Sequence, residues 1–161
     1  MTEREYNDCV KLYADNVYRF ILKNIKNEND AKDIVQSTYE KVWVNRNQVD
    51  NLKCKSYLFT VAYNTMIDSI RKNKRVILKD DFAENDFGSN NQQQNTKRVI
   101  EEALNKLNSR DKSLVLLKDY EGYNYAEIGE ITGLNESQVK VYLHRARLQL
   151  REYLVSVNNV I

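Results

Sequence analysis

The chain has 161 residues, which is enough for one ordinary domain or two small ones. Hydrophobic residues make up 42% and charged residues 30%, a composition that excludes disordered and fibrous proteins. The net charge of +2 hides a segregated pattern, because seven lysines and arginines lie between positions 53 and 79 and four acids follow between 80 and 87.

The N-terminal residues, MTEREYNDCVKLYADN, contain acids and no apolar core, so we expect no signal peptide. No apolar run approaches the roughly 18 residues of a membrane span, and we expect no membrane insertion. Cys9 and Cys54 are too few for a disulfide framework and are expected to be reduced thiols in a cytoplasmic protein. Because the single histidine, His144, has no cysteine or carboxylate at ligand spacing, we expect no metal, and we expect no other cofactor.

The pattern predicts an all-α fold, since prolines are absent, glycines number four, and apolar residues recur with the helical period. Three amphipathic helices are expected to share one small N-terminal core. We expect the second helix to be capped by Asn29 or Asp30. The apolar stripes are Tyr6, Val10, Tyr13, Val17, Phe20 and Ile21; then Ala31, Ile34, Val35, Thr38 and Val42; then Leu58, Val61, Ala62, Thr65 and Met66.

The second helix also carries a polar stripe, formed by Asp33, Gln36, Ser37 and Glu40. Such a stripe is usually a solvated face. The pattern alone gives it no further role.

The third helix has a second stripe of aromatic and polar side chains, made of Phe59, Tyr63, Asn64, Ile67 and Arg71. Lysines and arginines flank it at Lys53, Lys55, Lys72, Lys74 and Arg75. An outward face of this kind is suited to stacking on unpaired bases and binding their phosphates. Alternatively, Phe59 and Tyr63 pack under the first helix, and the pattern does not decide between the two interpretations.

The helical pattern stops at Asp80–Asn95, which is acidic and then rich in asparagine and glutamine, so we predict a flexible linker over 79–96. Periodicity resumes from Val99 to Leu107 and again at Leu114 and Leu117. The sequence thus predicts two small helical domains, 1–78 and 97–161, joined by a linker.

The C-terminal segment predicts a helix-turn-helix. Asn124 with Glu127, and Asn135 with Gln138, have the spacing of capping boxes at the starts of two helices. Gly133 is suited to the left-handed turn between them, and Gly129 is small where the two helices are expected to cross.

The second helix of this motif is expected to turn Val139, Leu143, Ala146 and Leu150 towards the core. In a DNA-binding helix-turn-helix, the N-terminal residues of that helix meet base edges in the major groove. The alternative is a solvated basic surface helix. The groove-facing candidates are Ser137, Lys140, Val141 and His144, with Arg145, Arg147 and Arg151 near phosphates.

Three stretches together resemble bacterial RNA polymerase sigma factors of the sigma-70 family. They are DAKDIVQSTYEKVW (Asp30–Trp43), KSYLFTVAYNTMIDSIRKNKR (Lys55–Arg75) and YEGYNYAEIGEITGLNESQVKVYLHRARLQLREYL (Tyr120–Leu154). The short two-domain form is similar to the extracytoplasmic-function (ECF) subgroup, and the resemblance covers nearly the whole chain.

The resemblance implies a transcription initiation factor without catalytic chemistry. By similarity, Asp33, Gln36 and Glu40 bind core RNA polymerase. The loop before Ser56 and the helix carrying Asn64 recognise and help melt the downstream promoter element, and the helix-turn-helix recognises the upstream element. The family also implies an anti-sigma factor as a possible partner.

Two positions depart from the family pattern. Asn108 stands where many relatives have a proline, and Tyr142 stands where the family pattern has an arginine that contacts phosphate. The loop 45–55 is variable in the family, so base contacts are not transferred to its individual residues.

The main alternative is a stand-alone helix-turn-helix regulator, which leaves the N-terminal half without a role. An enzyme is disfavoured, because the sequence has no nucleophile elbow, phosphate-binding glycine loop or metal cluster. A protein-interaction adaptor would need no basic recognition helix.

Overall fold

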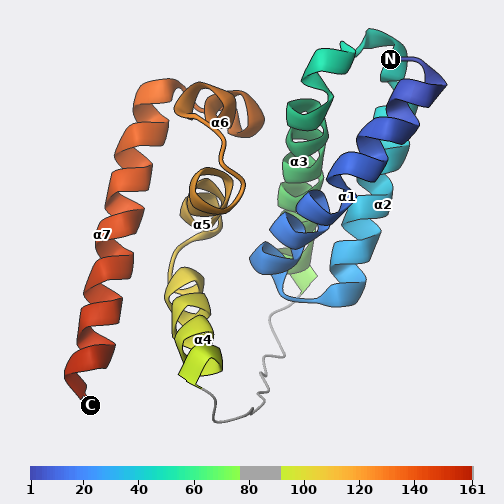
Figure 1. Ribbon diagram of the computed structural model, residues 1–161. Helices are drawn as coiled ribbons and strands as arrows, with labels where there is room; N and C mark the ends of the chain where they lie inside the picture. The colour runs from blue at the N-terminus through green and yellow to red at the C-terminus, as the bar shows by residue number, and fades with distance from the viewer. Residues whose placement is uncertain (77–91, 161) are drawn as a thin grey trace.

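The computed structural model describes residues 1–76 and 92–160, and every regular element in that part of the chain is helical. Figure 1 shows an N-terminal group of helices beside a C-terminal group. The predicted all-α fold in two helical parts is thus confirmed. The predicted linker, 79–96, lies mostly outside the described residues, and its last part, 92–96, belongs to a helix.

The N-terminal part is a three-helix bundle. Its helices are α1 (Glu3–Ile25), α2 (Glu28–Val44) and α3 (Cys54–Val76). A single left-handed residue, Lys26 (φ 58°), ends α1, and the chain enters α2 at once. Asn27 is therefore the N-cap of α2 and accepts a hydrogen bond from the backbone N–H of Asp30 (3.0 Å). The prediction that Asn29 or Asp30 caps this helix was wrong, because the connection is shorter than expected.

The predicted apolar stripes form the core of this bundle. Val17, Phe20, Leu58 and Met66 are each at most 1% exposed. Between α2 and α3, the chain makes two short 3-10 turns, η1 (Arg46–Gln48) and η2 (Asn51–Lys53). These turns occupy the loop that precedes Ser56.

The C-terminal part contains four α-helices and one π-helical turn. They are α4 (Gln92–Asn105), α5 (Ser109–Val115), the π-helical turn η3 (Leu116–Tyr120), α6 (Tyr125–Thr132) and α7 (Glu136–Val160). Asn108, where the family resemblance leads us to expect a proline, is the N-cap of α5. Its side chain accepts a hydrogen bond from the N–H of Asp111 (2.8 Å). An asparagine at this position therefore starts the helix through its side chain.

The two parts contact each other. Helix α3 packs against α6, and α1 packs against α5. In Figure 1, α5 and α6 lie between α7 and the N-terminal bundle. The buried apolar residues of both parts form one continuous cluster, so the chain is folded as a closed pair of helical units.

Candidate nucleic-acid interface

The helix-turn-helix begins each of its helices with the capping box that the sequence predicts. The N–H of Asn124 donates to the Glu127 carboxylate (2.9 Å), and the N–H of Glu127 donates to the Asn124 side chain (2.8 Å). Asn135 and Gln138 make the same reciprocal pair at 3.0 and 2.8 Å. Four backbone N–H groups at helix starts are thereby satisfied without water.

Two glycines set the turn between α6 and α7. Gly133 has φ 81° and ends α6, a conformation that disfavours residues with a Cβ. A Cβ added at Gly129 would lie 2.7 Å from the carbonyl oxygen of Leu134, which is too close. Both predicted roles are confirmed, and together they bring α7 tightly across α6.

Helix α7 buries one face and exposes the other. Val139, Leu143 and Ala146 are at most 1% exposed. All seven predicted DNA-contacting residues of this helix are exposed: Ser137, Lys140, Val141, His144, Arg145, Arg147 and Arg151. The predicted face is therefore available to a duplex.

Two cations of this face already contact neighbours. Lys140 lies 3.8 Å from the Glu136 carboxylate, and Arg147 pairs with Asp119 at 2.7 Å. Both pairs are about half exposed, so bringing either cation to a phosphate requires little desolvation.

Tyr142, which stands at the arginine of the family pattern, is not on the exposed face. The guanidinium of Arg110 stacks on its ring at 3.7 Å, so the tyrosine joins α7 to α5.

Helix α3 presents an exposed polar and basic surface beside buried aromatics. Asn64, Arg71 and Lys72 are exposed, as is Lys53 just before the helix. Arg75 lies in α3, but its side chain is outside the part that the structure describes.

Lys55 and Ser56, at the start of α3, are half-buried. The Lys55 ammonium lies 5.6 Å from the ring centroid of Tyr13 and 4.9 Å from that of Tyr123. Ser56 donates its hydroxyl to the carbonyl of Lys53 (3.3 Å).

Of the two interpretations left open for Phe59 and Tyr63, the outward face for base stacking is contradicted, because both side chains are buried. Phe59 is 0% exposed and packs between Phe20 of α1 (5.5 Å between centroids) and Tyr123 of the C-terminal part (5.2 Å). Tyr63 is only 7% exposed. Burying the Phe59 ring against apolar side chains on both sides is more favourable than leaving it in water. The alternative interpretation, packing under the first helix, is therefore correct for Phe59, which contacts Phe20 of α1.

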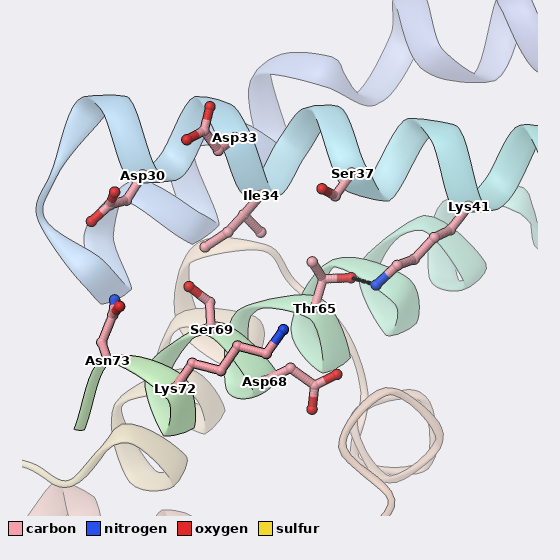
Figure 2. Close-up of a pocket in the computed structure, with 10 residues that line it drawn as sticks. All are labelled: Asp30, Asp33, Ile34, Ser37, Lys41, Thr65, Asp68, Ser69, Lys72 and Asn73. Atoms are coloured by element: carbon pink, nitrogen blue, oxygen red, sulfur yellow. Dashed lines mark hydrogen bonds between the residues drawn. The ribbon is translucent and has the colours of Figure 1, made fainter. Parts of the chain in front are cut away.

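The polar stripe of α2 is exposed as expected at Asp33, Gln36 and Glu40, whereas Ser37 is half-buried. The Gln36 amide donates to the Glu40 carboxylate across one turn (3.3 Å). Figure 2 shows Asp33 at the rim of a pocket between α2 and α3, with Lys72 on the opposite helix. Lys41 closes one end of this pocket by donating to the Thr65 hydroxyl (3.0 Å).

The sequence pattern did not reveal the polar contacts between the two parts. Arg19 of α1 forms a forked ion pair with Glu121, whose side chain is 1% exposed (shortest distance 3.1 Å). Lys112 of α5 donates to the carbonyl of Asn24 at 2.9 Å. Burial, and then the nearby charge of Lys26, lowers the pKa of Lys112 to about 8. No spacing rule marks such partners, since they are far apart in the sequence.

Within the described residues, no group of three histidine, cysteine or carboxylate side chains is arranged to hold a metal. In the same part of the chain, no helix is both long and apolar enough to cross a bilayer.

The fold and this surface define the class of protein: it is a helical protein whose C-terminal helix-turn-helix exposes a basic recognition helix. Two family models then match the chain, sigma-70 region 2 over residues 9–76 and sigma-70 region 4 over residues 97–150. The chain is 31% identical to the RNA polymerase sigma factor SigV of Bacillus subtilis, covering 89% of this chain and 87% of SigV. It is 30% identical to the ECF sigma factor SigM of the same bacterium, with 90% and 92% covered.

The chain belongs to the sigma-70 family, in the ECF group of sigma factors. Its members are transcription initiation factors rather than enzymes.

Solved structures agree on the fold. The sigma factor RpoE of Bartonella quintana, solved with the anti-sigma factor NepR, superposes with a TM-score of 0.74 at 24% identity, covering 94% of this chain and 97% of RpoE. CnrH, solved with the cytosolic domain of CnrY, gives 0.72 at 19% identity, with 96% and 90% covered. The two-part helical arrangement is thus shared with structures of low sequence identity.

Proposed function

We propose that this ECF sigma factor binds core RNA polymerase in the cytoplasm, directs it to specific promoters and helps melt them. The observation that carries the proposal is the exposed face of α7 on a turn built by two capping boxes and Gly133. In DNA-binding proteins of this type, the second helix lies in the major groove and its N-terminal residues contact the base edges. The sigma-70 region 2 match over residues 9–76 gives a role to the N-terminal half, which the stand-alone regulator interpretation leaves without one.

Upstream recognition is assigned to α7. Ser137, Lys140, Val141 and His144 face the base edges, and Arg145 and Arg147 face phosphates. A well-placed base contact is worth about 1–3 kcal/mol of discrimination.

Core binding is assigned to the exposed stripe Asp33, Gln36 and Glu40 on α2. The three side chains are spaced three and four residues apart, so they lie on one face of the helix. Their exposure leaves the carboxylates available to a cationic partner surface.

Downstream-element binding is assigned to α3 and the loop before it. Lys53, Asn64, Arg71 and Lys72 are exposed for contact with DNA. Lys55, Ser56 and Arg75 complete the proposed set. Phe59 and Tyr63 contribute only in an arrangement that uncovers them.

An anti-sigma factor is a proposed further partner. Two structural neighbours, RpoE and CnrH, were solved with such partners or with a cytosolic partner domain. The present chain has the same fold of two helical parts, and a partner can insert between these parts.

Reconstitution tests the proposal. The purified protein is added to sigma-free core polymerase, and transcripts are mapped on fragmented genomic DNA of the source organism. Discrete new start sites that share two spaced upstream motifs are expected. Duplex binding without core binding or initiation would instead establish the stand-alone regulator.

A further inference from the structure

We propose that Cys9 and Cys54 form a redox pair, in which hydrogen peroxide joins the two thiols in a disulfide that ties α1 to the start of α3. Both residues are free and buried cysteines in the structure. Disulfides that form in compartments where thiols are kept reduced are usually transient and redox-sensing. The two side chains are called the thiol pair.

The thiol pair lies where α1 packs against the start of α3. Cys9 belongs to the second turn of α1, and Cys54 is the first residue of α3. In Figure 1, both helices begin at the same end of the bundle. Tyr13, one turn after Cys9 on the same helix face, has its ring centroid 5.6 Å from the Lys55 ammonium. The neighbours of both cysteines therefore contact each other as well.

The Cys9 thiol faces the sulfur of Cys54. Burial, followed by a side-chain hydrogen bond with Cys54 and the charge of that residue, raises the pKa of the Cys9 thiol well above its usual range. A hydrogen bond that raises the pKa of a thiol favours its protonated form, so the S–H of Cys9 donates towards Cys54. Such a hydrogen bond holds the two sulfurs side by side, which is the first requirement for a disulfide.

A surface pocket gives small oxidants access to the thiol pair. The pocket has a volume of about 300 Å³, and its lining includes both cysteines, Leu12 of α1 and Leu52 of η2. Leu12 is 68% exposed and Leu52 is 91% exposed, so neither side chain seals the pocket. Cys54 is 9% exposed and Cys9 only 2%, so peroxide reaches Cys54 first. The pocket and the pairing distinguish these residues from two inert cysteines of an apolar core.

The oxidation proceeds in two balanced steps. The sulfur of Cys54 attacks one oxygen of hydrogen peroxide, the O–O bond breaks, and Cys54 becomes a sulfenic acid as one water leaves. The sulfur of Cys9 then attacks the Cys54 sulfur, the S–O bond breaks, and a second water leaves with the proton of Cys9. Two electrons pass from the sulfurs to peroxide, so two thiols and one peroxide give one disulfide and two waters.

The disulfide would lie beside the surface that is assigned to downstream DNA. Lys53, Lys55 and Ser56 flank Cys54 in the chain, and this consequence rests on their proposed function. A bond to α1 fixes the end of the loop 45–55 against the bundle, so the loop can no longer adjust to unpaired bases. Oxidation should therefore reduce initiation, and reduction should restore it.

The experiment treats the purified full-length wild type, Cys9→Ala and Cys54→Ala with hydrogen peroxide. Free thiols are titrated in denaturant before and after treatment, and intact mass and peptide mapping without reductant identify the bond. Wild type unfolded in urea before peroxide is added shows the reaction that does not depend on the fold. Initiation with core polymerase is measured for the reduced, the oxidised and the re-reduced wild type.

We expect the folded wild type to lose both thiols, to become lighter by two hydrogens and to remain a monomer, and dithiothreitol to restore both thiols. The cross-link should raise the unfolding temperature by about 5–10 °C, since it constrains the unfolded chain. Initiation by the oxidised wild type should fall at least about fivefold.

The two variants separate the roles of the thiols. Cys9→Ala should accumulate a sulfenic acid at Cys54, which dimedone traps, because the second thiol is missing. Cys54→Ala should lose its remaining thiol at least about tenfold more slowly than the wild type, since the Cys9 thiol is the more buried and remains protonated.

Retention of both thiols by the folded wild type, under conditions that oxidise the unfolded chain, would overturn the thiol pair. A disulfide that forms only between two molecules would overturn it as well. If an alanine variant proves unfolded under reducing conditions, the wild-type mass and thiol titration decide alone. Unchanged initiation by the fully oxidised protein would refute the effect on the downstream surface. Failure of the reduced wild type to initiate refutes the proposed function instead, because the thiol chemistry is measured without polymerase.

Discussion

Lys112 donates a hydrogen bond from its ammonium to the backbone carbonyl of Asn24 (2.9 Å), across 88 residues of sequence. The contact joins α5 to the end of α1. Its donor is a buried cation whose pKa is lowered to about 8, first by burial and then by the charge of Lys26. A pH dependence of stability follows directly.

Raising the pH from 7 to 9 should stabilise the wild type relative to Lys112→Gln. The charged lysine is disfavoured in the folded state, so the penalty is complete below about pH 8 and declines as pH rises towards the unfolded value of about 10.5. In that window the folded protein binds fewer protons than the unfolded chain. The expected gain is about 1 kcal/mol, measured by urea unfolding at both pH values.

The glutamine variant is the matched control. Its amide can still donate towards Asn24 but does not titrate, so subtraction removes the contributions of all other groups. The same pH dependence in both proteins would show that Lys112 is not the source.

Replacing Gly129 with alanine should destabilise the helix-turn-helix. The new Cβ would meet the carbonyl oxygen of Leu134 at 2.7 Å, and that oxygen belongs to the backbone of the turn. Overpacking of this kind costs about 1–3 kcal/mol. Thermal unfolding of the full chain measures the loss.

Gly133→Ala is the comparison for this prediction. Its added Cβ meets nothing within 4 Å, and only the left-handed backbone (φ 81°) opposes it. We expect the loss of stability to be about 1 kcal/mol here. If the Gly129→Ala variant unfolds at the same temperature as the wild type, the close crossing of α6 and α7 is contradicted.

The parts of the fold that the sequence predicted depend on local chemistry. Asn135 and Gln138 are three residues apart, and Gly133 ends the preceding helix, so a short window specifies the turn. Phe59 is different, because its stripe is compatible with either an outward or a buried face. Its burial is decided by Phe20 and Tyr123, which lie far from it in the sequence.

The polar contacts between the parts show the same limit more strongly. Arg19 and Glu121 are 102 residues apart, and each alone has the pattern of a surface charge. Only the packing of α1 against α5 and α3 against α6 buries the carboxylate and thereby makes the pair specific.

Reversing the charge at Glu40 should weaken core polymerase binding. Glu40 lies on the exposed stripe of α2 and accepts a hydrogen bond from Gln36. Glu40→Lys replaces an exposed acceptor with a cation, so we expect affinity for core to fall about tenfold. Fluorescence anisotropy with labelled protein measures it.

Binding of upstream duplex should be unchanged in this variant, because α7 is not involved. Glu3→Lys, a charge reversal at the start of α1, provides a control for the change in net charge. Equal losses in the two variants would show a general electrostatic effect rather than a site on α2.

Replacing Arg145 with alanine should weaken duplex binding to all sequences alike. Arg145 is exposed on α7, one residue beyond the groove-facing set, and is assigned to a phosphate. A lost phosphate contact releases about one counterion fewer, so the slope of log affinity against log salt should become shallower by about 1. Titrations of specific and scrambled duplexes at several salt concentrations measure both effects.

Arg98→Ala removes an equal charge from α4 and should retain the wild-type slope. A change in the preferred base, instead of a uniform loss, would place Arg145 at a base edge, because only a base contact distinguishes one sequence from another.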